Sequence, residues 1–243
     1  MTDSRALELV EKVLSNDALF KLAARELESL SPDLRAAEVL IEAFRGGRAQ
    51  PWLTAYLLGC IGHEAGYAVV REILLAAPRS LAESYAGVAL AKIRGVGAFE
   101  DLAALLIEAP QRVSREGAAY GLRELGGPAA MAAVAAAGRD RHIKLDVAAS
   151  ILAASVTAEL VLELLDSGGE RGLAIVAVII ESRLTTTETV EPWNPSESPG
   201  IVVAVRGSLE RHGHGLSQLR RRHLDQWLEQ HERKLVLANS EGQ

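Results

Sequence analysis

The sequence predicts an all-α protein, a right-handed α-solenoid of about five to six helix pairs with capping helices at its N- and C-termini. Two observations lead to this fold class. Alanine and leucine, both strong helix formers, together make up 75 of the 243 residues. A motif of apolar residues and glycine also recurs about every 32 residues, and a period of that length is typical of proteins built from stacked helix pairs.

The recurring motif marks the end of one helix and the start of a short break. Its second residue is leucine in four copies, Leu58, Leu90, Leu122 and Leu152, which lie 32, 32 and 30 residues apart, and Leu27 fits the same frame upstream. Glycine suits the left-handed backbone just past a helix end, and proline suits the first turn of the next helix. The predicted breaks lie at residues 31–32, 62–64, 94–97, 126–128 and 156–157.

The motif and its breaks place the helices in order: a capping helix, five helix pairs and a sixth first helix. Ser80 and Glu83 match a capping box at the start of the third pair. Pro78, Pro110 and Gly138 separate one pair from the next. The capping helix spans 4–15, the pairs span 18–29 with 33–45, 51–61 with 66–77, 80–93 with 99–109, 114–125 with 129–137 and 139–155 with 158–166, and the sixth first helix spans 171–184.

One copy of the motif and the helix after it resemble the HEAT repeat, in particular the short bacterial form first described in phycobilisome lyases. The residues that carry the resemblance are Leu58-Gly59-Cys60-Ile61-Gly62, Tyr67, Val70, Ile73 and Leu74. The resemblance covers about residues 17 to 183 and weakens at Val156, where the usual glycine is missing. It implies a HEAT-like superhelix in which the first helix of each pair lines the convex face and the second lines the concave face.

The repeat pattern stops after Leu184. Residues 185–200 read TTTETVEPWNPSESPG, and loops longer than about 12–15 residues are uncommon in compact domains. Two interpretations stay open: a binding loop anchored by Trp193, because tryptophan is enriched at interface hot spots, or an insertion whose tryptophan packs on a neighbouring helix. The predicted organisation is a capping helix over 1–16, repeats over 17–184, an inserted loop over 185–200, and a last helix pair with the C-terminal cap over 201–243.

The last two helices are predicted from their ends. A helix resumes at Ile201 and ends near Arg211, although its β-branched start also fits a short strand. Gly213 and Gly215 break the chain after it. The last helix, over 217–237, is rich in charged residues, as the terminal element of a repeat array has to be.

Composition excludes several classes of protein. Hydrophobic residues make up 49% of the chain, enough to bury a core, so intrinsic disorder is excluded. The single cysteine excludes a disulfide framework and a multi-cysteine zinc site. No apolar run approaches the ~18 residues of a membrane helix, and the start MTDSRALELVEK lacks the apolar core of a signal peptide. We therefore expect a cytoplasmic protein with no membrane partner.

Histidines and the cysteine are the first candidates for chemistry. His212, His214, His223 and His231 lie close together in the sequence, but no carboxylate completes a recognisable set of metal ligands. The pair Cys60 and His63 has the spacing of a nucleophile and its base, yet Cys60 falls on the buried frame of its helix. The Gly-Gly pairs at 46–47, 126–127 and 168–169 are interpreted as helix C-caps rather than phosphate cradles. We expect no catalytic residue, no metal and no cofactor.

Charge is the most informative functional feature. The second helices of the five pairs carry ten acidic residues and three basic ones, whereas the first helices and the residues that lead into them are richer in arginine. An acidic concave groove would attract a basic protein and repel nucleic acid, which excludes nucleic acid as the predicted partner. The function predicted is a non-catalytic scaffold for protein–protein interaction. Its candidate partner-binding residues are Glu72, Asp101, Glu108, Glu159, Glu163 and Trp193.

A second function belongs to a different class. The resemblance to phycobilisome lyases implies a concave face that could hold a tetrapyrrole chromophore or another cofactor. Such sites are apolar with a few well-placed polar groups. No residue known to handle a bilin can be carried over to this sequence, so chromophore binding is the alternative to protein binding.

Overall fold

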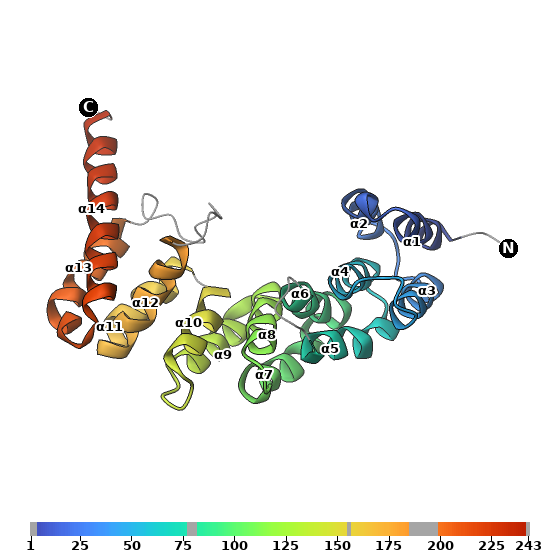
Figure 1. The fold of residues 1–243 in the computed structure, drawn as a ribbon, viewed down its shortest axis with the longest axis horizontal. Helices are drawn as coiled ribbons and strands as arrows, with labels where there is room; N and C mark the ends of the chain where they lie inside the picture. Colours follow the sequence, from blue (N-terminus) through green and yellow to red (C-terminus); the bar gives the residue numbers. More distant parts are fainter. Residues whose placement is uncertain (1–3, 77–81, 155–156, 185–198, 242–243) are drawn as a thin grey trace. The chain divides into compact units, whose positions relative to one another are not determined.

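The structure, a computed structural model, describes residues 4–76, 82–154, 157–184 and 199–241 (Figure 1). Every regular element in these ranges is a helix, which confirms the all-α class. The chain divides into two compact units, Met1–Val134 and Ala135–Gln243, called unit 1 and unit 2 below. The boundaries expected at residues 16, 184 and 200 stay predictions. None of the described helices is long and apolar enough to cross a membrane.

Unit 1 opens with a cap and continues as helix pairs. Helix α1 packs on both α2 and α3, so it covers the first pair. A short 3-10 turn precedes α2, and two more precede α5 and α7, which are the second helices of the next two pairs. The elements are α1 (Arg5–Ser15), η1 (Asp17–Leu19), α2 (Phe20–Leu27), α3 (Leu34–Arg45), α4 (Pro51–Ile61), η2 (Glu64–Gly66), α5 (Tyr67–Ala76), α6 (Ala82–Arg94), η3 (Gly95–Ala98), α7 (Phe99–Glu108) and α8 (Arg112–Leu125), and α9 (Gly127–Arg139) starts in this unit.

Local side-chain chemistry explains where the helices of unit 1 begin and end. The Asp33 side chain accepts a hydrogen bond of 2.8 Å from the backbone N–H of Ala36, which caps α3. Gly62 and Gly126 end α4 and α8 with φ of +67° and +66°, a conformation that costs glycine little. These glycines lie at the breaks that the sequence predicts. The predicted capping box of the third pair depends on Ser80, which lies outside the described residues.

The first helices of successive pairs pack against each other in unit 1, with α6 between α4 and α8. Glycine makes this approach close. A Cβ atom on Gly59 would lie 2.9 Å from the Cα of Ala89, and one on Gly121 would lie 2.5 Å from the carbonyl oxygen of Gly87. A Cβ on Gly87 would overlap the carbonyl group of Gly117. The helices therefore touch backbone to backbone, and leucines such as those of the repeated motif fill the core beside them.

Unit 2 is also helical, and its central helix is α12, which packs on α10, α11, α13 and α14. The predicted strand-compatible segment at Ile201 lies inside a helix. The elements are the end of α9, α10 (Leu145–Ala154), α11 (Ala158–Ser167), α12 (Gly169–Leu184), α13 (Pro199–His212), η4 (Gly213–Gly215) and α14 (Gln218–Glu241).

One predicted helix start in unit 2 is wrong. The fifth first helix was expected from residue 139, but α9 continues to Arg139 and α10 begins only at Leu145. The reason is a turn at Asp140, whose side chain accepts a 2.9 Å hydrogen bond from the N–H of His142. An aspartate that bonds the backbone two residues ahead favours a turn over a helix. The Arg171 side chain helps to fix the same turn, because it donates hydrogen bonds to the carbonyl oxygens of Asp140 and Ile143.

Candidate functional site

Asp101 is the predicted site residue with the most contacts in unit 1. The hydroxyl of Tyr67 donates a 2.9 Å hydrogen bond to its carboxylate, and Nε of Arg71 lies 3.1 Å from the same group. Burial, and next the bond to Asp101, raise the pKa of Tyr67 to about 12, so the phenol stays protonated and donates. Asp101 therefore ties α7 to α5, and its charge is partly neutralised by Arg71.

Tyr67 also contacts an arginine of α6, and we call these contacts, together with the bonds to Asp101, the clamp. The guanidinium of Arg94, at the end of α6, stacks over the Tyr67 ring at 3.5 Å from its centroid. Arg94 also bonds the carboxylate of Glu64 through Nε at 2.8 Å. The residues joined by these bonds lie 30 to 34 positions apart in the sequence, which is about one repeat. The clamp thus connects equivalent places in successive helix pairs.

Glu72 and Glu108 differ from Asp101. Both side chains are exposed on second helices, α5 and α7. Neither forms an ion pair with a cation in the described part of the chain, and three further exposed glutamates of α3 and α7 share this property. We call the set the unpaired acids of unit 1: Glu38, Glu42, Glu72, Glu100 and Glu108.

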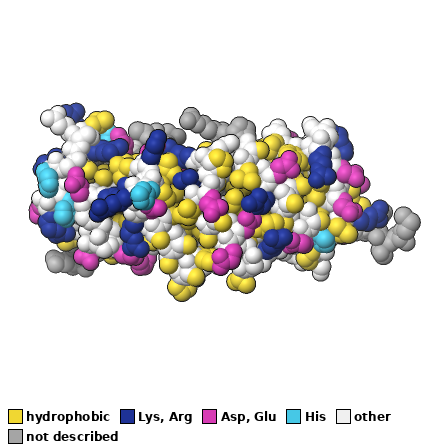
Figure 2. All heavy atoms as spheres, turned by 90° about the horizontal axis from the view of Figure 1, so that it is seen from below, with side chains coloured by type: hydrophobic (Ala, Val, Ile, Leu, Met, Phe, Trp, Pro, Cys, Tyr) yellow, Lys and Arg dark blue, Asp and Glu magenta, His cyan; other side chains and the backbone are white. Residues whose placement is uncertain are grey.

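The surface of the molecule is not uniformly negative. Figure 2 shows one face, on which acidic and basic side chains mingle and hydrophobic side chains lie between them. Ion pairs such as that of Arg71 with Asp101 also neutralise part of the acidic charge. A basic partner would therefore meet separate carboxylates instead of a continuous acidic band.

In unit 2 the predicted residues Glu159 and Glu163 lie one turn apart on α11, and both are exposed. Glu159 occupies the first turn, where hydrogen bonds from its own backbone N–H and from the Thr157 side chain lower the pKa of its carboxyl. Glu163 forms an ion pair with Arg139. Both acids thus have local structural contacts. Trp193, the sixth predicted residue, lies outside the described residues.

A feature that the sequence analysis missed is a cluster of aromatic side chains on the first helices of unit 1. Phe20 of α2 meets Trp52 and Tyr56 of α4 edge to face, at centroid distances of 5.1 and 5.8 Å. Tyr85 of α6 continues the cluster at 5.1 Å from Tyr56. We call these four residues the aromatic cluster; all four are half-buried, and the whole chain has only ten aromatic residues.

The aromatic cluster has a sequence signal. Phe20, Trp52 and Tyr85 are separated by 32 and 33 residues, so the repeat period places them at equivalent positions of three first helices. At its edge, Nζ of Lys92 lies 2.5 Å from the Glu28 carboxylate, which is the main reason that the pKa of Glu28 is lowered. An apolar patch with a charged edge is the usual anatomy of a protein interface.

Cys60 and His63 do not form a catalytic pair. The Cys60 side chain is buried, and burial above all raises the pKa of its thiol to about 12, so the reactive thiolate is scarce at neutral pH. The Nδ1 atom of His63 accepts a 3.2 Å hydrogen bond from the N–H of Ala65 and caps η2. Among the described residues no hydrogen bond joins the two side chains.

The C-terminal histidines have structural neighbours. Nδ1 of His231 lies 2.8 Å from the carbonyl oxygen of Trp227, and the two rings stack at 4.4 Å. Nδ1 of His223 lies 3.4 Å from the Glu181 carboxylate. Within the ranges that the structure describes, no group of three histidine, cysteine, aspartate or glutamate side chains could hold a metal ion.

No family model, no curated protein and no solved structure matches this chain.

Proposed function

We propose that the protein is a non-catalytic scaffold that binds another protein, built as a HEAT-like α-solenoid. Side-chain contacts at about one repeat support the solenoid: Tyr67 and Arg71 bond Asp101, Arg94 bonds Glu64, and Cys60 lies 3.7 Å from Glu28. Each joins positions 30 to 34 residues apart, as expected for pairs stacked in register.

The observation that carries the protein-binding role is the aromatic cluster. Tryptophan and tyrosine are the residue types most enriched at interface hot spots, because they offer a large contact area and lose little conformational freedom on binding. In a chain that has so few aromatic residues, four half-buried ones on three neighbouring helices form a concentrated contact surface. Their mutual edge-to-face packing holds the rings ready for a partner.

The proposed partner is basic. The unpaired acids of unit 1 leave their carboxylates available to cations of another molecule, and the chain has a net charge of −6. Such charges act mainly on the association rate and on the choice of partner, and they repel nucleic acid. We place this activity in the cytoplasm, a reducing compartment in which a single free cysteine stays a thiol.

The test uses two variants that remove the same charge. Partner proteins captured from native lysate by the wild-type chain are identified by mass spectrometry, and their affinities are then measured with purified proteins. We expect Glu72→Gln with Glu108→Gln to weaken a basic partner about 3- to 10-fold, mostly through the association rate. The control, Glu11→Gln with Glu210→Gln, removes two exposed acids elsewhere and should change affinity less than about twofold.

A third variant tests the aromatic cluster itself. Trp52→Ala, in a first helix, should weaken the same partner by about tenfold or more, the loss typical of a hot-spot residue, whereas the acids of the second helices act on that partner at longer range and mainly through the association rate. If Trp52→Ala binds the partner as tightly as wild type does, the aromatic cluster is not the binding surface and the proposal loses its main support. Equal loss in the two charge variants would show that only net charge matters and that the unpaired acids have no special role.

The tetrapyrrole alternative stays a prediction. Covalent attachment of a bilin through Cys60 is disfavoured, since its thiol is buried and mostly protonated. Titration of the purified protein with biliverdin, followed by its visible absorbance, separates the two functions: a saturable spectral shift at micromolar protein favours the alternative.

A further inference from the structure

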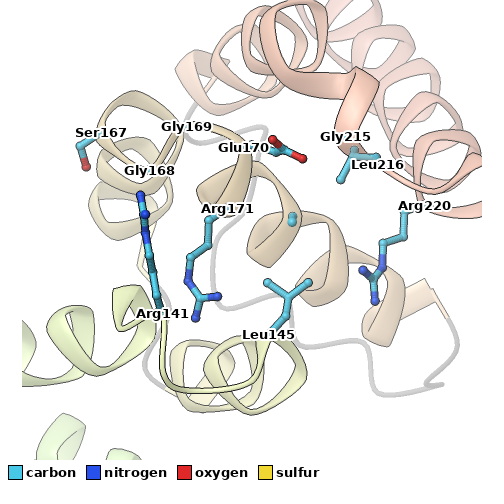
Figure 3. A pocket seen from close by; sticks show the side chains of 11 residues that line it. Arg141, Leu145, Ser167, Gly168, Gly169, Glu170, Arg171, Gly215, Leu216 and Arg220 are labelled. Carbon is cyan, nitrogen blue, oxygen red and sulfur yellow. The ribbon is translucent and has the colours of Figure 1, made fainter.

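A cavity of about 740 Å³ opens within unit 2, where the start of α12 faces α14 and the turn before α10. Its volume lies in the range of small-molecule sites. Figure 3 shows three arginines that reach this space from three different elements. The residues that matter for its chemistry are Arg141, Arg171, Arg220, Glu170, Leu145 and Leu216.

The cavity carries more positive than negative charge. Arg141 is exposed, and no acid among the described residues pairs with it. Arg171 donates from Nη2 to the carbonyl oxygens of Asp140 and Ile143 at 2.7 and 2.9 Å, which fixes its guanidinium without neutralising it. Its buried Nε has no hydrogen-bond partner among the described residues.

The third arginine has only a weak counter-ion. Nε of Arg220 lies 3.6 Å from the Glu181 carboxylate, which also faces His223 at 3.4 Å. Within the lining, Glu170 is the single carboxylate against three guanidinium groups. A planar guanidinium binds phosphate and carboxylate groups through two parallel hydrogen bonds, so three of them around one cavity favour a ligand with more than one negative charge.

Backbone N–H groups at the start of α12 add to the positive electrostatic potential of the cavity. Gly168 and Gly169 line the cavity, and the first hydrogen bond within the helix runs from the N–H of Gly172 to the carbonyl of Gly168. The N–H groups of residues 169–171 come before that bond and have no acceptor within the helix. They lie at its positive end, and the helix has 16 residues. The Gly168-Gly169 pair, interpreted from the sequence as a cap, does end α11, but it also borders the arginines.

We propose that this cavity binds a small phosphate monoester. The arginines would hold the dianionic phosphate, and the apolar side chains of Leu145 and Leu216 would contact the organic part of the molecule. The two leucines explain why the ligand is an ester and not inorganic phosphate alone. This site is separate from the aromatic cluster and from the unpaired acids, so it does not depend on the scaffold function.

The test is isothermal titration of the full chain with AMP, inorganic phosphate and adenosine as probes. AMP should bind with a measurable dissociation constant, phosphate about tenfold more weakly, and adenosine not at all up to about 10 mM. Arg141→Gln and Arg220→Gln should each weaken AMP about tenfold or more. Arg141 is the primary variant, because it is exposed and forms no hydrogen bond or ion pair with the described residues.

Two further variants make the result specific. Arg222→Gln removes the same charge from the exposed side of α14, outside the cavity, and should change AMP affinity less than about twofold. Glu170→Gln removes the repelling carboxylate and should tighten AMP several-fold. The proposal is overturned if AMP does not bind at about 10 mM, if adenosine binds as tightly as AMP, or if Arg222→Gln weakens AMP binding as much as Arg141→Gln does.

Discussion

The glycines of α6 and α8 in unit 1 have different surroundings from those of α13 in unit 2. In unit 1, Gly87, Gly117 and Gly121 lie where α6 crosses α8, and each faces backbone atoms of the other helix. In unit 2, Gly200 of α13 has no atom near its missing Cβ, and Gly207 faces only the flexible end of Arg211. The first set permits a helix crossing, whereas the second simply weakens a helix.

Arginines differ between the units in a parallel way. Arg71 and Arg94 of unit 1 bind carboxylates about one repeat away and stabilise the stack. In unit 2, Arg171 binds carbonyl oxygens and, with Arg141 and Arg220, faces a cavity. Other arginines of unit 2, Arg139 and Arg206, also pair with carboxylates, so the difference concerns the three arginines around the cavity. The distinction lies in the partner that each side chain meets, which composition alone does not reveal.

The largest effect is expected at the crossing of α6 and α8. Gly87→Ala would push a methyl group into the backbone of Gly117, which helices held by neighbouring pairs cannot easily avoid. We expect a loss of about 3 kcal/mol in the free energy of unfolding. Chemical denaturation measures it. Gly207→Ala in unit 2 is the control and should raise stability by about 0.5–1 kcal/mol. If Gly87→Ala leaves stability unchanged or raises it as the control does, the crossing is not close.

A smaller effect is expected from two buried serines. Oγ of Ser114 donates a 2.7 Å hydrogen bond to the carbonyl of Leu74 and joins α8 to α5, whereas the buried Oγ of Ser208 in α13 has no hydrogen-bond partner in the part of the chain that the structure describes. Ser114→Ala should cost about 1–2 kcal/mol, because it leaves a buried carbonyl without its donor. Ser208→Ala should be neutral or stabilising. Urea midpoints of the two variants decide the matter, and equal shifts would contradict the difference.

The smallest effect concerns pH. The hydrogen bond from Lys92 lowers the pKa of Glu28, whose ordinary value is 4.5. A carboxyl with a lowered pKa in the folded state stabilises the fold fully above its unfolded pKa, and the gain is lost as pH falls through the folded value. Glu28→Gln should therefore be slightly less stable than wild type at pH 7 and equally stable near pH 2. Glu11→Gln, which removes an exposed acid that forms no ion pair with the described residues, should show no such convergence.

Much of the helical organisation could be predicted from the sequence, because helix ends follow local rules. Pro51 and Ile61 bound α4 as expected, and Gly62 and Gly126 have the positive φ that their breaks require. The start of α10 could not be found this way, since the turn at Asp140 competes with a segment of good helix formers. Local propensity is a weak guide where a side chain can bond the backbone in another conformation.

The candidate sites were harder to predict. Counting acids identified Glu72 and Asp101 as equals, but the stacking of pairs brings Arg71 to Asp101, while no cation among the described residues pairs with Glu72. The aromatic cluster was within reach of the sequence, because Phe20 and Trp52 lie one repeat apart. The arginine cavity was not, since its residues come from a turn, a helix start and the last helix, at no common spacing.

The reactivity of Cys60 toward thiol reagents can measure how often the first helix pairs open. It is the sole cysteine of the chain and is buried in α4, so a thiol reagent reaches it only when that helix separates from its neighbours. The rate of its modification therefore reports the opening of the first repeats in the native protein, without any label. A cysteine introduced on the surface of unit 2 would react far sooner, so one sample could carry a dye at a chosen place while Cys60 still times the opening.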